Sequence, residues 1–419
     1  MRSLSLPFAE QKTTIFAASG PAAAGPGLLA FRTNLPFNIE HTTEHNNTMT
    51  NQNNRTNQKT SRREALHSLS RALALPLATG AFSGFGNAAE GGVGKIKIGQ
   101  IGVGHAHASK LSAFRESKDF EVVGIVEEDP QLRERAQKDA VYRDLKWMTT
   151  EQLLNVPGLR AVLVETRVRD LLNTAEKCIN AGKHIHLDKP AGESLPQFKR
   201  IIDSAAKQKL LIQMGYMYRY NPAVVLMRDF LKKGWLGDVF EVHTVMSKVV
   251  DPGTRRELAE YAGGIMFELG CHIVDQVIGV LGKPMKVTPF PRHSSSLDDR
   301  LVDNMLAVLE YPRATATVRT SALEVDGFER RLLVVCGTEG TFHIQPLDNP
   351  SARVTLSKPH GSYPKGYQDI TFPKYVRYVD DAADMARIIR GEKPTDFSYE
   401  HDMTVQTTVL QACGLSLEK

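Results

Sequence analysis

The feature that most constrains how this chain folds is an ordered run of local patterns between residues 95 and 129. An alternating β-rich stretch over 96–101 ends at Gly102-Val103-Gly104, a helical stretch follows, and a second β-rich stretch over 120–126 leads into a run of acids. A strand, a glycine turn, a helix, a second strand and a terminal acid are the successive parts of the βαβ unit that binds dinucleotides. The pattern therefore predicts that the folded part of the chain begins with a Rossmann-type parallel sheet.

Each part of this unit has a physical task. Gly102 permits a tight turn, and Gly104 lets backbone amides approach a pyrophosphate at the start of the helix. Glu127 stands 23 residues beyond Gly104, where it can accept hydrogen bonds from the adenosine ribose. A carboxylate there repels a 2′-phosphate, so we expect NAD rather than NADP. His107 occupies the third glycine position, which makes the glycine pattern weak when it is taken alone. The predicted cofactor-binding residues are Gly102, Val103, Gly104, His105, Ala106, Glu127, Thr166 and Lys189.

Strands and helices continue to alternate beyond this unit. Apolar runs at 161–164, 184–187 and 210–214 are predicted strands, and apolar residues at helical spacing predict helices over 171–179 and 195–205. Elements in this order form an α/β fold with a doubly wound parallel sheet. We therefore expect an NAD-binding Rossmann domain over residues 95–215.

The first 89 residues have a different character. They read as a disordered leader that contains Ser61-Arg62-Arg63 followed by an apolar pair, which is similar to a twin-arginine export signal. An apolar stretch over 72–85 is too short to span a bilayer, and small residues offer a cleavage site near Ala88–Gly92. We expect translation to start at Met49, export to the periplasm by the twin-arginine route, and no stable membrane insertion after the signal is removed. The competing interpretation is a cytoplasmic protein with a disordered leader in which two arginines adjoin by chance.

Charge and cysteine content exclude several classes of function. Residues 1–89 hold eight Lys/Arg and four Asp/Glu, so the rest of the chain, with 44 and 43, is almost neutral. A nearly neutral folded part does not suit a nucleic-acid partner. The four cysteines, Cys178, Cys271, Cys336 and Cys413, form no C-x-x-C pair, so we expect neither a disulfide framework nor a metal site.

Four ordered motifs carry a resemblance to a known family. They are Gly182-Lys183-His184 with Asp188-Lys189-Pro190, the segment Gly215-Tyr216-Met217-Tyr218-Arg219-Tyr220-Asn221-Pro222, the segment from Gly263 to Asp275, and Gly337-Thr338-Glu339-Gly340-Thr341. From about Lys95 to the C-terminus the chain resembles the Gfo/Idh/MocA oxidoreductases. Asp188 and Glu268 depart from the family, which commonly has Glu and Asp there. Residues 166–171 lack the proline and histidine of the family's loop after the third strand, so contacts made from that loop are not carried over.

The resemblance implies a second α+β domain over residues 216–419, built on a large, mostly antiparallel sheet whose face covers the nicotinamide. The local pattern agrees with this expectation. β-rich runs occur at 239–245, 305–309, 314–318 and 331–335, and the segment 396–415 reads as a terminal helix. Members of the family are often dimers or tetramers through this sheet, so the resemblance also implies a homodimer or a homotetramer.

The chemistry of alcohol oxidation points to three catalytic candidates. Hydride removal from a secondary alcohol needs a base for the hydroxyl proton and a cation or donor beside the developing alkoxide. Lys189 follows the fourth predicted strand, at the edge where open α/β sheets bind ligands, and the resemblance assigns it the role of polarising the reacting oxygen. Glu268 and His272 are four residues apart, so they lie on one face of a predicted helix. We expect His272 to be the general base, because an imidazole titrates near pH ~6.5, and Glu268 to orient the substrate or the imidazole. A purely structural His–carboxylate pair is the alternative.

Polar groups near the predicted domain junction are candidates for substrate binding. Tyr218, Arg219 and Asp275 offer the hydroxyl, guanidinium and carboxylate groups that a sugar or polyol needs. Aromatic packing explains the tyrosine almost as well, and Asp275 reads more readily as structural. Arg255 and Arg256 could meet an acidic sugar, but a solvated loop is the better interpretation.

Together these residues predict an enzyme, an NAD-dependent oxidoreductase that acts on a secondary hydroxyl of a sugar or polyol. We expect the cofactor to be held tightly, because free NAD is scarce outside the cytoplasm. A second interpretation is a glycosidase in which NAD oxidises the sugar transiently, as in some exported relatives of the family. A third is a non-catalytic sugar-binding protein.

Overall fold

The computed structural model describes residues 94–418. The leader, with its arginine pair, Met49 and the expected cleavage site, lies outside the described residues. Within the described range, no helix is long and apolar enough to cross a lipid bilayer.

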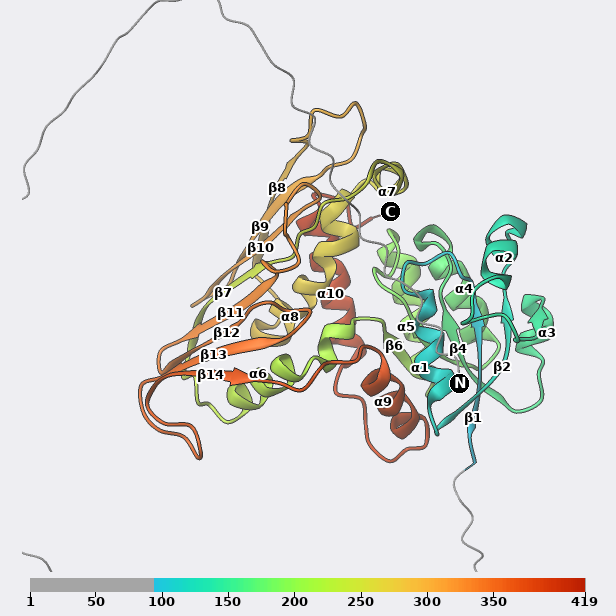
Figure 1. The fold of residues 1–419 in the computed structure, drawn as a ribbon, viewed down its shortest axis with the longest axis horizontal. Coiled ribbons are helices and arrows are strands. Elements are labelled where there is room, and N and C mark those ends of the chain that lie inside the picture. The colour runs from blue at the N-terminus through green and yellow to red at the C-terminus, as the bar shows by residue number, and fades with distance from the viewer. Residues whose placement is uncertain (1–93, 419) are drawn as a thin grey trace, which may run out of the picture. The chain divides into compact units, whose positions relative to one another are not determined.

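The first lobe is built on a six-stranded sheet in the order β3-β2-β1-β4-β5-β6, in which every neighbouring pair is parallel. Its strands are β1 (Ile96–Ile101), β2 (Phe120–Val126), β3 (Trp147–Met148), β4 (Leu159–Val164), β5 (His184–Leu187) and β6 (Ile212–Met214). The central strands β1 and β4 are almost wholly buried, as a parallel sheet covered on both faces requires. The Rossmann-type sheet predicted for this part of the chain is confirmed (Figure 1).

The helices of this lobe are α1 (Leu111–Glu116), α2 (Pro130–Gln137), α3 (Thr150–Leu154), α4 (Val168–Asn180) and α5 (Leu195–Lys207). α4 and α5 each bury one apolar stripe at helical spacing. Asp129 caps α2 by accepting hydrogen bonds from the amides of Gln131 and Leu132. A 3₁₀ turn, Ala108–Lys110, precedes α1, so the regular helix begins seven residues after Gly104.

The carboxyl ends of four parallel strands meet at one edge of this sheet. Gly102 follows β1, Glu127 follows β2, Thr166 lies two residues after β4, and Lys189 lies two residues after β5. The strand order reverses between β1 and β4, and open α/β sheets bind their ligands at such a point. The fold therefore brings the predicted cofactor-binding residues to one edge.

The second lobe is built on an eight-stranded sheet in the order β14-β13-β12-β11-β7-β10-β9-β8, which is antiparallel except for the β7–β10 pair. Its strands are β7 (Val239–Val245), β8 (Lys286–Arg292), β9 (Asn304–Glu310), β10 (Thr315–Ser321), β11 (Leu332–Gly337), β12 (Gly340–Ile344), β13 (Ser351–Leu356) and β14 (Gly366–Thr371). Burial alternates along these strands: on β9, Met305, Ala307 and Leu309 are buried, whereas Leu306 and Val308 are half-buried. One face thus packs on the core, and the predicted large, mostly antiparallel sheet is confirmed.

Helices cover the buried face of this second sheet (Figure 1). They are α6 (Pro222–Lys232), which follows the 3₁₀ turn η2 (Met217–Tyr220), then α8 (Cys271–Leu281) and α10 (Tyr399–Ala412). α8 and α10 pack against each other and against the sheet. A π-helical turn, η3 (Met266–Gly270), runs directly into α8, and a short helix, α7 (Pro252–Leu258), precedes it. The terminal helix predicted over 396–415 is α10.

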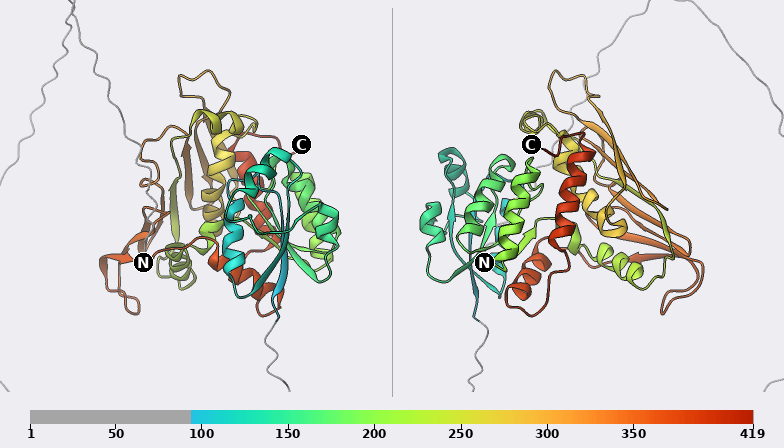
Figure 2. Two further views of the ribbon diagram at one scale, coloured as in Figure 1. Left: turned by 45° about the vertical axis from the view of Figure 1, so that its right-hand side comes forward. Right: turned by 180° about the vertical axis from the view of Figure 1, so that it is seen from behind.

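One helix returns to the first lobe after the second sheet is complete. α9 (Val379–Ile389) buries Ala382, Met385, Ala386 and Ile389 in the same apolar cluster as Leu111 and Phe114 of α1. Figures 1 and 2 show α9, in the red-orange part of the chain, beside the first lobe. The segment between β14 and α9 therefore passes close to the edge that carries the predicted site, where the Tyr378 ring lies 6.1 Å from the ring of His107.

Candidate active site

The glycine turn after β1 brings its backbone very close to the end of β4. Gly102 has a φ of +94°, and a Cβ at this position would lie 2.4 Å from the amide nitrogen of Thr166. A Cβ at Gly104 would lie 3.0 Å from Cγ of Arg167. The amides of Gly104 and Ala106 donate hydrogen bonds to no other described residue. The turn therefore has the space and the free donors that a phosphate group requires.

Glu127 stands in the wall of a cavity of about 250 Å³ beside this turn, and Thr166 and Arg167 line the cavity from the β4 side. Its carboxylate accepts hydrogen bonds from the amides of Val103, at 2.8 Å, and Asp129, at 2.9 Å. These bonds fix the carboxylate at the end of β2. Each carboxylate oxygen has a further lone pair, so Glu127 can still accept from two ribose hydroxyls.

These features fit a dinucleotide. The cradle at Gly102 and Gly104 would be filled by a Cβ, and an anchored carboxylate ends β2. The buried hydroxyl of Thr166 has no hydrogen-bond partner among residues 94–418. The amides of Gly104 and Ala106 would hold a pyrophosphate, and Glu127 a ribose.

Lys189 lies almost fully buried between the two lobes. Its Nζ donates to the backbone oxygen of Glu268 at 2.8 Å and to the Glu268 carboxylate at 2.9 Å. Burial alone lowers the pKa of this ammonium, but the charge of Glu268 more than compensates and raises the pKa above its ordinary value. Burial likewise raises the pKa of Glu268, and Lys189 overrides it so that the pKa falls below its ordinary value. The two groups are a charged pair, and the third N–H of Lys189 remains for a substrate oxygen.

His272 opens α8 and is 2% exposed. Its ring lies edge-on to Tyr216 and Tyr218, with centroids 6.1 and 5.2 Å away, and 5.9 Å from the ring of His107. Burial, followed by the nearby charge of Lys189, lowers the pKa of His272 well below its ordinary value. Its Nδ1 has no hydrogen-bond partner among the described residues. A neutral imidazole beside a fixed ammonium can accept a hydroxyl proton.

A buried charged cluster holds the backbone of Lys189. Lys110 Nζ lies 2.8 Å from Asp188 and 3.1 Å from Glu165, while Nδ1 of His105 and Nδ1 of His107 lie 2.9 and 3.3 Å from Asp188. Burial by itself raises the pKa of Asp188, but His105, Lys110 and His107 together hold it well below its usual range. Asp188 accepts from the amide of Lys189 at 2.7 Å, and a ring nitrogen of His105 contacts the Lys189 carbonyl oxygen at 3.0 Å.

The same cluster explains the imidazole at the third glycine position. His107 reaches the Asp188 carboxylate, and its ring faces those of His272 and Tyr378. The ligand atoms of His105, His107 and Asp188 lie within 4.8 Å of one another, a spacing that a metal ion can use. Lys110 already supplies a buried positive charge to the Asp188 carboxylate. We therefore assign these residues to positioning Lys189.

Two of the predicted substrate-binding residues lie in a buried cluster of ion pairs. Arg219 and Asp275 are almost fully buried and form an ion pair at 2.6 Å, and Arg219 also pairs with Asp402 of α10 at 2.7 Å. Their charges neutralise each other inside the second lobe, so the prediction that they bind substrate is corrected: they fasten α10 to α8. Tyr218 lies against His272, but its hydroxyl donates to Asp348 at 2.7 Å.

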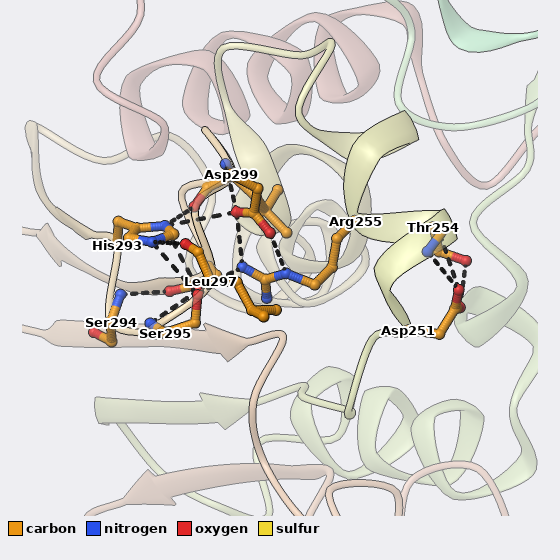
Figure 3. Close-up of polar contacts among 11 residues, drawn as sticks. Asp251, Thr254, Arg255, His293, Ser294, Ser295, Leu297 and Asp299 are labelled. Carbon is orange, nitrogen blue, oxygen red and sulfur yellow. Dashed lines mark hydrogen bonds and ion pairs between the residues drawn. The ribbon is translucent and has the colours of Figure 1, made fainter.

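Arg255 is also occupied, in contrast to the predicted solvated loop. It is 1% exposed, and its guanidinium pairs with Asp299 at 2.6 Å and with Asp303 at 2.9 Å. Figure 3 shows the guanidinium facing Asp299, next to the loop that carries His293 and Ser295. Arg255 therefore anchors α7 to the 293–303 loop and is not available to a substrate carboxylate.

A cleft of about 370 Å³ lies between the glycine turn and the second lobe. Gly104, His105 and Ala106 line it from the first lobe, and Lys248 and Glu268 line it from the second. Of the three catalytic candidates, Glu268 lines this cleft, and Lys189 is bound to Glu268 behind its wall.

Sequence reasoning missed several residues of this site. His105 and His107 were assigned only to the turn, and Lys110 and Lys248 were not singled out. The imidazole in place of the third glycine was a sequence signal for His105 and His107. Lys248 has no motif around it, so only the tertiary structure reveals it.

Comparisons with known proteins agree with this architecture. Residues 96–216 match the family described as "Oxidoreductase family, NAD-binding Rossmann fold", and residues 224–343 match the "GFO/IDH/MocA C-terminal domain". Myo-inositol 2-dehydrogenase of Thermotoga maritima is 24% identical over 316 residues, which cover 74% of this chain and 91% of that protein. An uncharacterized oxidoreductase of Schizosaccharomyces pombe is 24% identical over 199 residues, 46% of this chain and only 53% of that protein.

Solved structures share the fold at lower identity. An oxidoreductase from Agrobacterium radiobacter in complex with NAD+, L-tartaric acid and magnesium has a TM-score of 0.66 at 17% identity, over 77% of this chain and 97% of that one. KijD10, a 3-ketoreductase from Actinomadura kijaniata in complex with TDP-benzene and NADP, has a TM-score of 0.61 at 18% identity, over 76% and 96%. The two domain matches follow each other in sequence and together cover more than half of the chain. The first spans the six-stranded sheet, and the second spans the eight-stranded sheet from β7 to β12. The chain therefore belongs to the Gfo/Idh/MocA family of oxidoreductases, and it is an enzyme of that class.

Proposed function

We propose that this oxidoreductase oxidises a secondary hydroxyl of a sugar or polyol with NAD. The observation that carries the proposal is the grouping of Lys189, Glu268 and His272, of which Glu268 lines the cleft that opens onto the glycine turn. A charged donor and a neutral base at one edge of a dinucleotide-binding sheet suit alcohol oxidation, because the proton and the developing alkoxide both need a partner.

Each residue has a task in this proposal. His272 takes the hydroxyl proton, since its depressed pKa keeps it neutral. Lys189 donates its free N–H to the oxygen that becomes the carbonyl, while Glu268 holds the ammonium in place. The bound nicotinamide would accept the hydride. The buried cluster around Asp188 fixes the backbone of Lys189.

Substitution of the two central residues tests this assignment. Lys189→Met and His272→Asn should each reduce turnover by ~10²–10⁴-fold, the usual contribution of acid–base groups, with the fold unchanged by circular dichroism. Lys199→Met on the exposed surface of α5 and His360→Asn, whose ring stacks on Trp235 in the second lobe, serve as controls that change the same residue types. Full activity in His272→Asn would move the base elsewhere.

The class of reaction is read out in the same assays. Net NADH formation with free sugars or polyols supports the oxidoreductase. Release of an aryl group from a glycoside without net NADH supports the redox-neutral glycosidase instead. Binding of sugars without either reaction supports the non-catalytic sugar-binding protein.

The preference for NAD rests on Glu127. The carboxylate is anchored at the end of β2, where it would accept from the ribose and repel a 2′-phosphate. Glu127→Ala should weaken NAD binding by about 1–3 kcal/mol, the cost of leaving a buried donor unpaired, and should narrow the preference over NADP. Glu121→Ala, on the exposed side of β2, is the control. Equal wild-type affinity for the two cofactors would refute the assignment.

Location and assembly complete the proposal. Export by the twin-arginine route is supported by Ser61-Arg62-Arg63 and the small residues near Ala88–Gly92. Peptide mapping of exported protein in the native host tests it, and an intact leader on purely cytoplasmic protein would contradict it.

A homodimer or homotetramer through the second sheet is supported by half-buried apolar side chains such as Val308 and Val334 on the face opposite its helices. Light scattering measures the mass of the assembly in solution.

A further inference from the structure

The cleft contains a half-buried cation without a counter-ion. Lys248 lies three residues beyond the end of β7, and its side chain lines the second-lobe wall together with Glu268. Within residues 94–418 its ammonium forms neither a hydrogen bond nor an ion pair. A charge withdrawn from water without a partner costs free energy, so its placement needs an explanation.

The other cations that line the cleft are accounted for. Arg167 pairs with Asp129 at 3.2 Å, and Arg169 pairs with Glu260 at 2.6 Å. Arg135 is exposed, where water solvates its guanidinium. Among the described residues that line the cleft, Lys248 is thus the half-buried cation that remains unpaired.

The backbone of Lys248 is held firmly in this position. Its amide donates to the carbonyl oxygen of Ser321 at 3.0 Å. The neighbouring Ser247 is fastened twice, because its hydroxyl accepts from the amide of Ser321 at 3.0 Å and its carbonyl oxygen accepts from Arg331 at 3.3 Å. The side chain therefore leaves a fixed point on the sheet and enters the cleft.

The electrostatic surroundings do not compensate the charge. Burial lowers the pKa of Lys248, and although Glu268 opposes this effect, Lys189 and Arg331 add to it. Glu268 is already bound to Lys189 at 2.9 Å. Asp251 is engaged as the cap of α7 through the amides of Gly253 and Thr254. Glu257 also lines the cleft, but it forms no ion pair with Lys248.

We propose that Lys248 binds a carboxylate carried by the substrate, which makes the substrate an acidic sugar or polyol such as a uronate or an aldonate. The inference rests on the proposed function and narrows its substrate class. A single ammonium matches a monoanion in charge, and a carboxylate would give it the charge-assisted hydrogen bond that it lacks.

A dianionic phosphate is the poorer match for the same wall. No guanidinium fork is free there, since Arg167 and Arg169 are paired and Arg255 is held by Asp299. The carboxylates of Glu257 and Glu268 also line the cleft. These two carboxylates would repel a dianion more strongly than a monoanion.

The test compares acids with the neutral sugars of the same stereochemistry. Glucuronate and glucose, and galacturonate and galactose, are matched pairs, and we expect a higher kcat/KM for the acid of the preferred pair. Lys248→Met should lower the ratio of kcat/KM for that acid to kcat/KM for the neutral sugar roughly ten- to hundredfold, the range for a hydrogen bond to a charged group, mainly through the KM of the acid. Lys248→Arg should retain most of the preference. Lys207→Met, an exposed lysine at the end of α5, controls for the change in net charge.

Two further measurements keep the inference separate from the proposed function. Direct calorimetric binding of the acid to wild type and to Lys248→Met, in the presence of NAD, should reveal the loss even if turnover is absent. NAD affinity should be the same in both proteins. A neutral sugar preferred by the wild type, or an acid preference unchanged in Lys248→Met, would overturn the inference. A loss of NAD affinity in the variant would also overturn it, because Lys248 would then serve the pyrophosphate.

Discussion

At the scale of single residues, burial sets the charge state of the groups around the cleft. Burial lowers the pKa of His107 to about 4 despite the opposing charge of Asp188, and it lowers that of His272 well below its ordinary value. Lys189 keeps its charge because Glu268 lies 2.9 Å away. The site therefore combines neutral imidazoles with a fixed ammonium, as the proposed roles of His272 as proton acceptor and Lys189 as oxygen-polarising group require.

The pH dependence of catalysis follows from the His272 environment. A lowered pKa means that the imidazole stays unprotonated, and hence able to accept a proton, as the pH falls through 6.5. We expect kcat/KM, which reports the free enzyme, to remain level from about pH 8 down to about pH 6. A pH–rate profile with a saturating cofactor measures this. An acid limb with an inflection near 6.5 would identify a solvated histidine as the base instead.

Asp381, in the first turn of α9, provides a stability prediction. Its carboxyl oxygens are buried and have no hydrogen-bond partner among the described residues, and burial raises the pKa to about 7. A raised pKa favours the protonated form in the folded protein. The stability that the protonated carboxyl contributes is therefore complete below about pH 4 and is lost as the pH rises through 7.

Asp381→Asn should therefore stabilise the protein by about 1–3 kcal/mol at pH 8–9, given ~1.4 kcal/mol for each unit of pKa, with little effect at pH 4. Thermal unfolding followed across this pH range measures the gain. Asp380→Asn, at the exposed neighbouring position, is the matched control. An equal gain at pH 4 and pH 9 would contradict the titration of Asp381.

At the scale of elements, the π turn before α8 decides what Glu268 contacts. An extra residue in the turn breaks the regular i, i+4 relation, so Glu268 bonds to Lys189 while His272 packs against Tyr216 and Tyr218. Gly264 permits the turn's entry, since its φ is +51° and a Cβ there would lie 2.3 Å from the carbonyl oxygen of Val302. The predicted pairing of Glu268 with His272 on one regular helical face is thus replaced by a contact between the lobes.

The buried ion pairs of Arg219 join three elements of the second lobe, and their contribution to stability can be tested. Arg219 connects η2 to Asp275 of α8 and to Asp402 of α10. Arg219→Met leaves two carboxylates buried without their cation, so we expect a loss of about 3–5 kcal/mol in the free energy of unfolding. Lys233→Met, which removes an exposed pair with Asp229, should cost at most about 0.5 kcal/mol. An unchanged melting temperature together with a raised KM would return Arg219 to the substrate-binding residues.

At the scale of the whole molecule, the site is assembled from both lobes. Lys189 comes from the first lobe, Glu268 and His272 come from the second, and α9, which follows the second sheet, packs on the first. Because the two lobes share these contacts, a bound dinucleotide would lie between parts that hold each other in place. This arrangement favours slow release of the cofactor.

Retention of the nucleotide is the corresponding prediction. If the protein is exported by the proposed twin-arginine route, it crosses the membrane already folded and cannot replace a lost cofactor where free NAD is scarce. We expect a Kd well below micromolar, equivalent to roughly −10 kcal/mol or better. Protein purified without added nucleotide and dialysed extensively should still contain NAD by absorbance and mass spectrometry. An empty protein with a Kd of tens of micromolar would favour a cytoplasmic dehydrogenase.

The first lobe was predictable because its signals are local. The predicted strands at 96–101, 120–126 and 184–187 coincide with β1, β2 and β5. Buried parallel strands are continuous apolar runs, which stand out in any sequence. β3 was missed because it is only two residues long and is held by pairing with β2.

The second sheet was predictable only in part. β8 contains Pro289 and Pro291, which argue against a strand, but β8 lies at the edge of the sheet, where a missing amide is tolerated. On β13, exposed Arg353 and Thr355 alternate with buried Val354. Such a strand exists because its neighbours supply the hydrogen bonds, and its own composition contains little evidence of it.

The sequence by itself determined the local geometry of this protein: a turn that needs Gly102, buried apolar strands, and an acid at the end of β2. The tertiary structure decided which charges meet. It paired Arg219 with Asp275 and Asp402, and it placed Lys248 in the cleft without an ion-pair partner among the described residues. Backbone conformation and burial of a strand depend on neighbours within a few residues. Ion pairs form between residues far apart in the chain, and their cost or benefit depends on desolvation that only the folded molecule imposes.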